Sequence, residues 1–450
     1  MYKSVSLLLI MMLFTLSNIA QGLFENVTSE SNQENNNDKS VNFGGFVRAS
    51  AYGGSENYDY SNVFGEFSLQ TRMSANKTFF YGDIRVREGL FFNERQTIFE
   101  LKEAYAAYVD EYVSVSLGNQ IVKWGRTDGF NPTNNITPTD YFFLTPDPDD
   151  QLMSNFMLRS KVRISSFAEL DFIALPLFKE SNYRYELFNI SEEAKFYEAV
   201  LPERSFDNAS FGARLDFVLP SIEFAFSYFY GYDPFYGFRV NDVQLFPAVN
   251  IYYIPDFYKK STIGADFAIP LKQSIVRGEI AYNHTKDYKS NMHIPMPDIS
   301  NVFGIEHNFL KTIFILQYIG QYNIDFYNLQ EPVPPNPDDI PGQIQYAHDM
   351  INYESELFNR RIFNQQQEFN HAVMISLNRS FAYELLNFEF SGYYNFTSEE
   401  VFARPKINWK ITDNLAACFG ASLMFGPDNS VFYYSSKVLN GAFLSLKAGF

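Results

Sequence analysis

Residues 211–230 read FGARLDFVLPSIEFAFSYFY, and the alternation within this stretch decides the fold class. Every second residue from 211 to 219 is apolar, whereas Arg214 and Asp216 stand between them. After a break at 220–221 the alternation resumes, now with aromatic residues at every second position. Because successive side chains of a strand point to opposite faces of a sheet, the stretch predicts two strands joined by a tight turn.

This pattern, about ten alternating residues and then a break, repeats from Val41 to the end of the chain. In a soluble β-sandwich the apolar face of each strand would form the core. In a membrane barrel the apolar face meets lipid and the polar face lines a wet lumen. Alternation alone does not separate these folds, so the connections between the strands must decide.

The breaks come in two lengths, which alternate along the chain. Short breaks lie at 76–77, 110–111, 166–167, 219–221, 270–271, 310–311, 379–380 and 412–414. The longer polar connections are 125–155, 179–208, 231–260, 285–299 and 325–366. Short turns at one end and long loops at the other are typical of outer-membrane barrels, with periplasmic turns and extracellular loops. We therefore predict an all-β fold, a single antiparallel transmembrane β-barrel of about 18 strands, with 16 as the alternative.

The composition agrees with a barrel and excludes other classes of protein. Aromatic residues make up 18% of the 450 residues, which is too many for a disordered chain. The formal charge of −17 argues against nucleic acid as a partner, because binding it requires neutralising its phosphates. The one cysteine, Cys418, excludes a disulfide framework within the chain.

The first 22 residues have the features of a secretory signal peptide. Lys3 is followed by an apolar run, and Ala20-Gln21-Gly22 offers small residues for cleavage. An N-terminal membrane anchor is the alternative. We expect a signal peptide at 1–22, a flexible periplasmic leader at 23–40 and the outer-membrane barrel at 41–450.

The most distinctive segment runs from residue 101 to 140. It contains KEAY at 102–105, GNQ at 118–120, WGRTD at 124–128, NP at 131–132 and PTD at 138–140. These elements, with RGEIAY at 277–282, resemble a porin-like outer-membrane barrel family related to alginate-export channels. The resemblance implies an outer-membrane location and a channel role, and it does not identify a substrate. The last strand, predicted at 439–450, ends in GAFLSLKAGF (441–450). This segment resembles the terminal signature of outer-membrane proteins, in which Phe450 would be the signal for the barrel assembly machinery.

The glycines and Pro132 after Trp124 would bend the chain sharply where a strand leaves the membrane, and polar side chains can cap such a bend. One interpretation folds this loop into the lumen as a constriction, and the other packs it on the rim of the barrel. The candidate residues of the constriction are Lys123, Arg126, Asp128, Asn131 and Asp140.

Inward-facing charges are the candidates for selectivity. By the parity of the strands, Arg85 and Arg87 of the third strand and Arg159, Lys161 and Arg163 of the sixth face the lumen, as do Arg277 and Glu279. One hypothesis is a basic lane that favours anionic solutes. The alternative is that each cation pairs with a neighbouring carboxylate and only stiffens the wall.

The sequence contains few features that would indicate an enzyme or a metal site. The five histidines, at 284, 293, 307, 348 and 371, have no metal-ligand spacing, and no catalytic motif is present. The acidic runs 147–150 and 337–339 could hold calcium or could be solvated loop. We therefore predict a passive channel for small or polymeric solutes, without cofactor or resident metal, that contacts lipid, the assembly machinery and its solute. The alternatives are a surface receptor or adhesin with a plugged barrel and an outer-membrane hydrolase.

Overall fold

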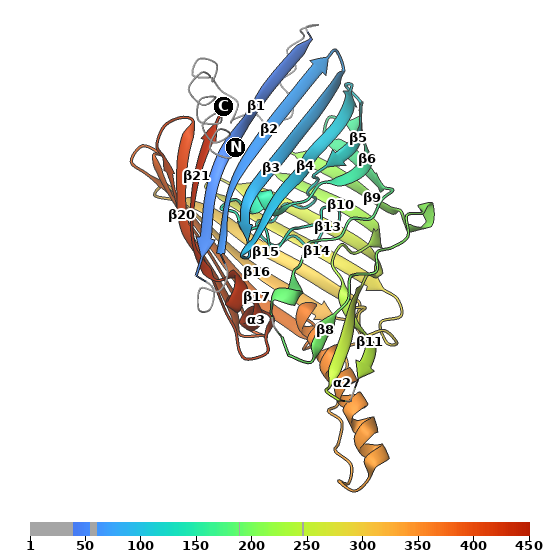
Figure 1. The fold of residues 1–450 in the computed structure, drawn as a ribbon. Coiled ribbons are helices and arrows are strands. Elements are labelled where there is room, and N and C mark those ends of the chain that lie inside the picture. The colour runs from blue at the N-terminus through green and yellow to red at the C-terminus, as the bar shows by residue number, and fades with distance from the viewer. Residues whose placement is uncertain (1–38, 55–60, 189, 245–246) are drawn as a thin grey trace.

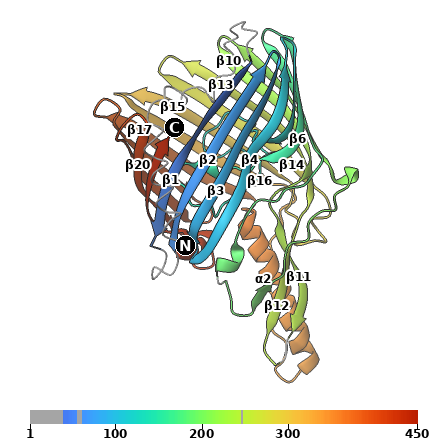
Figure 2. The ribbon, with the colours of Figure 1, turned by 45° about the horizontal axis from the view of Figure 1, so that its top comes forward.

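A computed structural model describes residues 39–54, 61–188, 190–244 and 247–450. The expected signal peptide and nearly all of the expected leader lie outside these residues. Eighteen of the described strands form one antiparallel sheet that closes into a barrel (Figure 1, Figure 2). This confirms the predicted fold and the count of 18 over 16. The barrel strands are β1 (Ser40–Gly53), β2 (Ser61–Ala75), β3 (Thr78–Phe91), β4 (Glu94–Val109), β5 (Val113–Gln120), β6 (Asn155–Ser165), β7 (Ala168–Leu175), β9 (Ser210–Leu219), β10 (Ile222–Tyr232), β13 (Lys259–Leu271), β14 (Ser274–Thr285), β15 (Asp298–Phe309), β16 (Thr312–Asn323), β17 (Phe369–Phe381), β18 (Leu386–Asn395), β19 (Glu400–Lys410), β20 (Leu415–Phe425) and β21 (Gly441–Gly449).

The first and last strands close the barrel. β1 pairs with β21 from Phe46 opposite Gly449 to Gly53 opposite Ala442. The terminal Phe450 continues this pairing, since its N–H donates to the carbonyl of Gly45 (3.0 Å) and its carbonyl accepts from the N–H of Gly45 (3.1 Å). Closure leaves no open edge, which a hydrocarbon environment would not tolerate.

Tight turns join the strands at one end, as predicted. They lie at 76–77, 110–112, 166–167, 220–221, 272–273, 310–311, 382–385 and 411–414. Leu310 and Lys311 both have positive φ (48° and 61°), the geometry of a two-residue hairpin turn whose twist matches the strands. Two turns lie two or three residues later than predicted, because β13 and β17 run on through apolar ends at Leu271 and Phe381.

The sequence pattern sorts the side chains between the two faces of the wall. Phe226, Ile263 and Phe303 are 57%, 58% and 49% exposed on the outside, whereas Arg214 and Glu279 are buried inside the barrel. An apolar exterior around a polar interior is the reverse of a soluble sandwich. It is the arrangement that a bilayer requires of a β-barrel.

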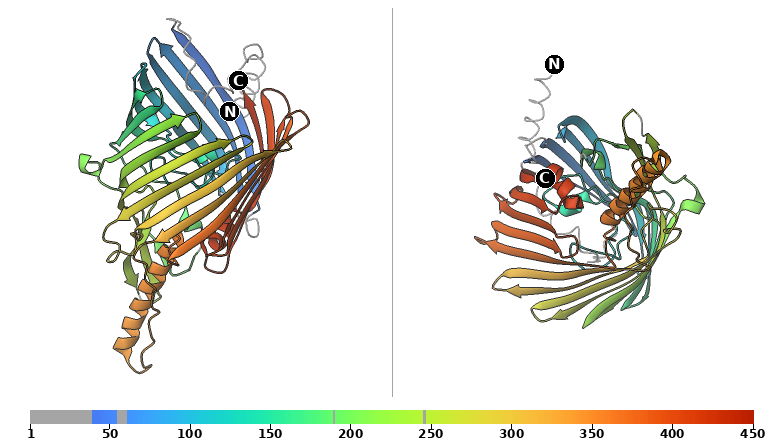
Figure 3. Two further views of the ribbon diagram at one scale, coloured as in Figure 1. Left: turned by 180° about the vertical axis from the view of Figure 1, so that it is seen from behind. Right: turned by 90° about the horizontal axis from the view of Figure 1, so that it is seen from below.

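The long connections emerge at the other end, where three of them build an arm. A small sheet of β8 (Ala194–Phe196), β11 (Gly237–Gln244) and β12 (Asn250–Asp256) packs beside the helix α2 (Ile340–Ile362). The helix and the β11–β12 ribbon project beyond the rim of the barrel (Figure 1, Figure 3). The shorter helix α3 (Val431–Leu439) lies in the connection before β21. Within the described residues, no helix is long and apolar enough to cross a bilayer.

Candidate functional site

The loop 121–154, between β5 and β6, folds into the lumen. Trp124 is 2% exposed and packs with Met157 of β6, Ile173 of β7 and Phe229 of β10. Its indole N–H donates to a carboxylate oxygen of Asp171 on β7 (3.2 Å). This inward path corresponds to the constriction interpretation rather than to a loop on the rim.

The bend after Trp124 is built around one carboxylate of the wall, Glu279 on β14. The backbone N–H groups of Arg126 and Thr127 each donate to its Oε1 (2.6 Å). The hydroxyls of Thr127 (2.7 Å) and Thr133 (3.0 Å) also donate to Glu279. Gly125 has φ +101°, and a Cβ there would lie 2.5 Å from the Glu279 side chain. Position 125 therefore requires glycine, because the backbone there has a positive φ and approaches the wall too closely for a side chain.

Arg126 carries the loop onto a cluster of charges on the wall. Its guanidinium binds Asp216 of β9 (2.9 Å), Glu223 of β10 (3.3 Å) and Asp266 of β13. Arg214 pairs with Asp216 (2.7 Å) and Asp266 (2.5 Å), so two guanidinium groups face three carboxylates. Burial lowers the pKa of Arg126, but the hydrogen bonds and charges of Asp266 and Asp216 prevail and raise it above its usual value.

The other predicted loop residues take different positions. Asp128 pairs with Arg277 (2.9 Å), which also binds Glu306 (2.6 Å), and burial raises the pKa of Asp128. The amide of Asn131 accepts from the hydroxyl of Thr133 (3.1 Å) beside the bend. Lys123 turns to Asp149 of the same loop (2.5 Å), where both side chains are exposed.

Asp140 accepts hydrogen bonds within the long connections and, in the described part of the chain, binds no charged group of the wall. Its Oδ1 accepts from the N–H of Phe142 and from the amide of Asn182, each at 3.0 Å. Burial raises the pKa of Asp140, and among the described residues no cation lies within 4.0 Å of it.

The other end of the inward loop is bound to the opposite side of the barrel wall. Asp150 lies in the short helix η2 (Pro148–Gln151) and pairs with Arg48 of β1 (2.6 Å) and Arg85 of β3 (2.7 Å). Lys102 of β4 donates to the carbonyls of Asp150 (2.6 Å) and Leu152 (2.5 Å). Burial raises the pKa of Asp150, but Arg48 and Arg85 outweigh it and hold that pKa below its usual value. The loop therefore spans the lumen and is held on both walls.

The predicted basic residues fall into two groups that the strands β4 and β5 separate. On β3, Arg85 pairs with Asp83 (3.0 Å) as well as Asp150, and Arg87 pairs with Glu100 (2.8 Å). On β6, Arg159 pairs with Asp171 (2.7 Å) and Lys161 with Glu169 (3.4 Å), whereas Arg163 is exposed. These contacts are those of the wall-stiffening alternative, and the role of the residues in selectivity stays a prediction.

A cavity of about 750 Å³ remains between the loop, the ends of α2 and α3, and the wall from β16 to β20. Nine of the 26 residues that line it are aromatic, and its cations are Arg361, Arg404 and Lys406. Lys406 pairs with Glu389 (2.8 Å). Nothing in the sequence distinguishes Arg404 and Lys406 from other inward-facing cations, because the cavity is defined by loops that are distant in the chain. Within the described residues, no group of three or more His, Cys, Asp and Glu side chains is placed to hold a metal ion.

Comparison with known proteins gives the fold its relatives. No family model and no curated sequence matches the chain. Among solved structures, the chain is similar to the outer-membrane protein OpdK from Pseudomonas aeruginosa, with 7% identity over 91% of this chain and 99% of that one and a TM-score of 0.54. It is also similar to OccK3 (OpdO) from the same organism, with 11% identity over 91% and 95% and a TM-score of 0.52. What these proteins share is the barrel fold.

A third similar structure is P. aeruginosa OccK2 (OpdF), determined in complex with glucuronate. Its identity is 7% over 91% of this chain and 97% of that one, with a TM-score of 0.50. At such low identity the likeness extends to the fold alone.

Proposed function

We propose that this protein is an outer-membrane channel that lets small solutes cross passively. The observation that carries the proposal is the closed barrel with an apolar exterior, whose polar lumen contains an inward loop and still keeps a cavity of about 750 Å³. We infer that the loop, which is fastened to both walls, narrows the pore without filling it. The expected signal peptide and the fold shared with OpdK support the location.

We infer that the solutes are small rather than polymeric. The cavity lies within the range of small-molecule pockets, roughly 300–1,000 Å³. The segment 101–140 resembles a porin-like family related to alginate-export channels, and its glycines and prolines here shape a loop that crosses the lumen. We therefore take the resemblance as one of loop architecture and not of polymer export.

We also propose a preference for anions, despite the acidic net charge. Of the acids that line the cavity, Asp233 pairs with Lys260 (2.7 Å) and Glu389 with Lys406, whereas Glu400 accepts from the N–H of Phe432 (2.8 Å). Among the described residues, no carboxylate lies within 4.0 Å of the cations of Arg361 or Arg404. Unpaired guanidinium groups in a narrow pore attract anions. The glucuronate bound to OccK2 is an anion of the size that the cavity accommodates.

The projecting arm favours one second candidate, a surface receptor or adhesin. Its aromatic core, in which Phe238 packs against Tyr236, Phe257 and Phe358, gives the arm an ordered shape beyond the rim. A receptor would not need to conduct. A hydrolase, the third possibility, is supported by none of these contacts.

Liposome swelling tests the proposal. Liposomes that contain the folded protein should swell in glucose and faster in glucuronate, and they should not swell in a dextran too large for the cavity. Liposomes with heat-unfolded protein are the control. Swelling no faster than in this control would refute the channel, and equal rates with glucose and glucuronate would refute the anion preference.

A further inference from the structure

A groove of about 220 Å³ lies on the outer face of the barrel wall, across β10, β13, β14 and β15. The left view of Figure 3 shows these strands from outside the barrel. Ten residues line the groove, among them Phe226, Ala265, Gly278, Ile280 and Phe303. We call it the wall groove, and it is separate from the cavities of the lumen.

The wall groove offers an apolar surface to the outside. Phe226, Ile280 and Phe303 are each about half exposed. Asp266 and Glu279 also line the groove, but their side chains point into the lumen, where both bind the inward loop. Only the backbone of these two residues therefore borders the groove, and an occupant would meet no charged group.

Two small residues account for the hollow. Ala265 is paired across the sheet with Phe226 on one side and with Ile280 on the other. Gly278 is paired with Phe303, and a Cβ at the glycine would lie 3.0 Å from the phenylalanine ring. Because large outward side chains surround the small ones, the wall is recessed at Ala265 and Gly278.

The edge of the groove on β10 is held in place by aromatic packing. Phe224 stacks on Phe217 of β9, with 4.7 Å between the ring centroids and 17° between the planes. It also contacts Phe226 edge to face, with 5.9 Å between the centroids. Such contacts restrict the rings that form the edge, so the groove is shaped before anything occupies it.

The depth of the groove limits what can cover it. Its outward-facing residues lie between the third and the seventh strand residue from the tight turns at 220–221, 272–273 and 310–311. A strand crosses the bilayer in about 9–11 residues. The groove therefore lies within the hydrocarbon, in the periplasmic half and up to the middle, where only acyl chains or another protein can reach it.

We propose that the wall groove binds an acyl chain of a phospholipid in the periplasmic leaflet. An unfilled hollow loses van der Waals contacts, and a flexible chain can follow its shape. An apolar cavity of about 150 Å³ takes up benzene, so 220 Å³ is room for several methylene groups.

A second copy of the chain is the other possible occupant. A stable protein interface needs roughly 20–30 residues from each partner, whereas ten residues line the groove. The size of the groove therefore favours a lipid chain. A lipid site on the outer wall goes beyond the proposed channel function, which concerns the lumen.

The probe is a phosphatidylcholine with a photoreactive diazirine in the middle of one acyl chain, diluted into phosphatidylcholine vesicles that contain the folded full-length protein. After illumination, mass spectrometry of the digested protein locates the labelled residues. Phe80 and Leu117 are exposed lipid-face residues of β3 and β5 at the same depth. Label should be about fivefold more frequent at Phe226 and Phe303 than at these two, because a bound chain makes more contacts there.

Ala265→Leu should fill the groove while keeping the wall apolar, so label at Phe226 should fall to the level at Phe80. Ala106→Leu is the matched control, because Ala106 is the fourth strand residue from the turn at 110–112 and is paired with the outward Phe80. It should leave the enrichment unchanged. Both variants should keep the heat-dependent gel mobility of a folded barrel, and Ala265→Val replaces the leucine variant if that one does not fold.

Equal labelling of the groove and the comparison residues in the parent protein would overturn the proposal, as would an enrichment that survives Ala265→Leu. Depletion of label at the groove, together with a dimer in analytical ultracentrifugation that Ala265→Leu dissociates, would show that a second copy covers it and would refute the lipid site. None of these outcomes decides whether the protein conducts, so the channel is tested separately.

Discussion

Asp150→Asn should release one end of the inward loop. The Asp150 side chain is 11% exposed and pairs with the guanidinium groups of Arg48 and Arg85, which are 2% and 8% exposed. Removing one partner of a buried pair costs about 3–5 kcal/mol when the remaining charge has no other partner. Here Arg48 keeps Glu66 and Arg85 keeps Asp83, so we expect a cost of about 2 kcal/mol. That cost shifts the ratio of released to fastened loop by about thirtyfold.

Single-channel recording in planar bilayers measures this effect, because a released loop should widen the pore and make the current noisier. Asp149→Asn is the matched control: it is the adjacent residue, and its pair with Lys123 is exposed and contributes little. The asparagine variants should both show the heat-dependent gel mobility of a folded barrel. Equal conductance and noise in the two variants would refute the claim that Asp150 fastens the loop.

The acid dependence of the fastening has a definite sign. The pKa of Asp150 in the folded protein lies below its ordinary value, so the ion pairs contribute fully above that ordinary value, about 3.9, and weaken only in stronger acid. The conductance of the parent should not change on this account between pH 7 and about pH 4. A widening of the parent pore already at pH 5 that is absent in Asp150→Asn would contradict the assignment.

Three further changes test other parts of the structure. Phe226→Lys, on the lipid face, should lower the free energy of unfolding by roughly 2–4 kcal/mol. Gln70→Lys, beside Asp83 in the lumen, should change this free energy little. Equal effects of the two variants in urea titrations would mean that the two faces of the wall are assigned wrongly. Deleting Phe450, which pairs with Gly45 and stacks on Phe67, should lower the yield of folded protein in the outer membrane, and an unchanged yield on heat-shift gels would end its role as an assembly signal. Burial raises the pKa of Asp140, so its negative charge destabilises the folded protein increasingly as pH rises above about 4. Asp140→Asn should therefore raise the melting temperature at pH 7 but not below about pH 4. An equal rise in melting temperature at both pH values would contradict this assignment.

The strands and turns could be predicted because their determinants are local. Alternation in 211–230 needs only neighbours in the chain to place Phe226 outside and Arg214 inside. A turn such as 310–311 is fixed by the two strands that it joins. The exact end of β17 is less predictable from the sequence, because both polar and apolar residues can continue a strand near the membrane surface.

The path of the inward loop could not be predicted, since its contacts join residues far apart in the chain. Asp150 lies 102 positions from Arg48, and the N–H of Arg126 lies 153 positions from Glu279. The sequence indicated a sharp bend at Gly125 and charged residues after it. Which carboxylates those residues would reach depends on the closed barrel, so inside and rim placements remained open.

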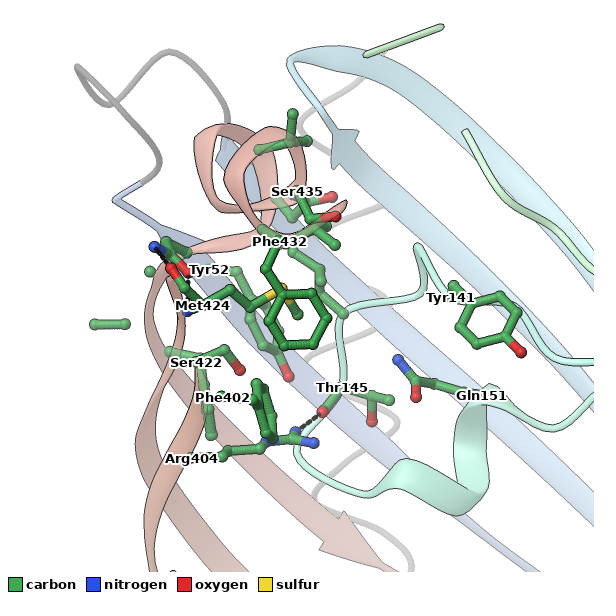
Figure 4. Close-up of a pocket in the computed structure, with 18 of the residues that line it drawn as sticks. Tyr52, Tyr141, Thr145, Gln151, Phe402, Arg404, Ser422, Met424, Phe432 and Ser435 are labelled. Carbon is green, nitrogen blue, oxygen red and sulfur yellow. Dashed lines mark hydrogen bonds between the residues drawn. The ribbon is translucent and has the colours of Figure 1, made fainter. Parts of the chain in front are cut away.

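The positions of the cavities depend even less on local sequence pattern than the path of the inward loop does. Arg404 is one inward cation among many, and its lack of a carboxylate partner follows from the loop backbone at Thr145 that occupies its other side. Tyr52 reads as an ordinary aromatic residue at the end of a strand. Only the packing of α3 over these residues encloses the second cavity, of about 340 Å³, that they line (Figure 4).

Recording from the parent protein in a planar bilayer under a KCl gradient tests the central claim most directly. The account predicts stepwise insertions with a steady conductance and a reversal potential of the sign that anion preference gives. A protein that shifts on heating in gels, and is therefore folded, yet produces no conductance steps would contradict the channel. Steps with a reversal potential of the opposite sign would leave a channel without the proposed anion preference.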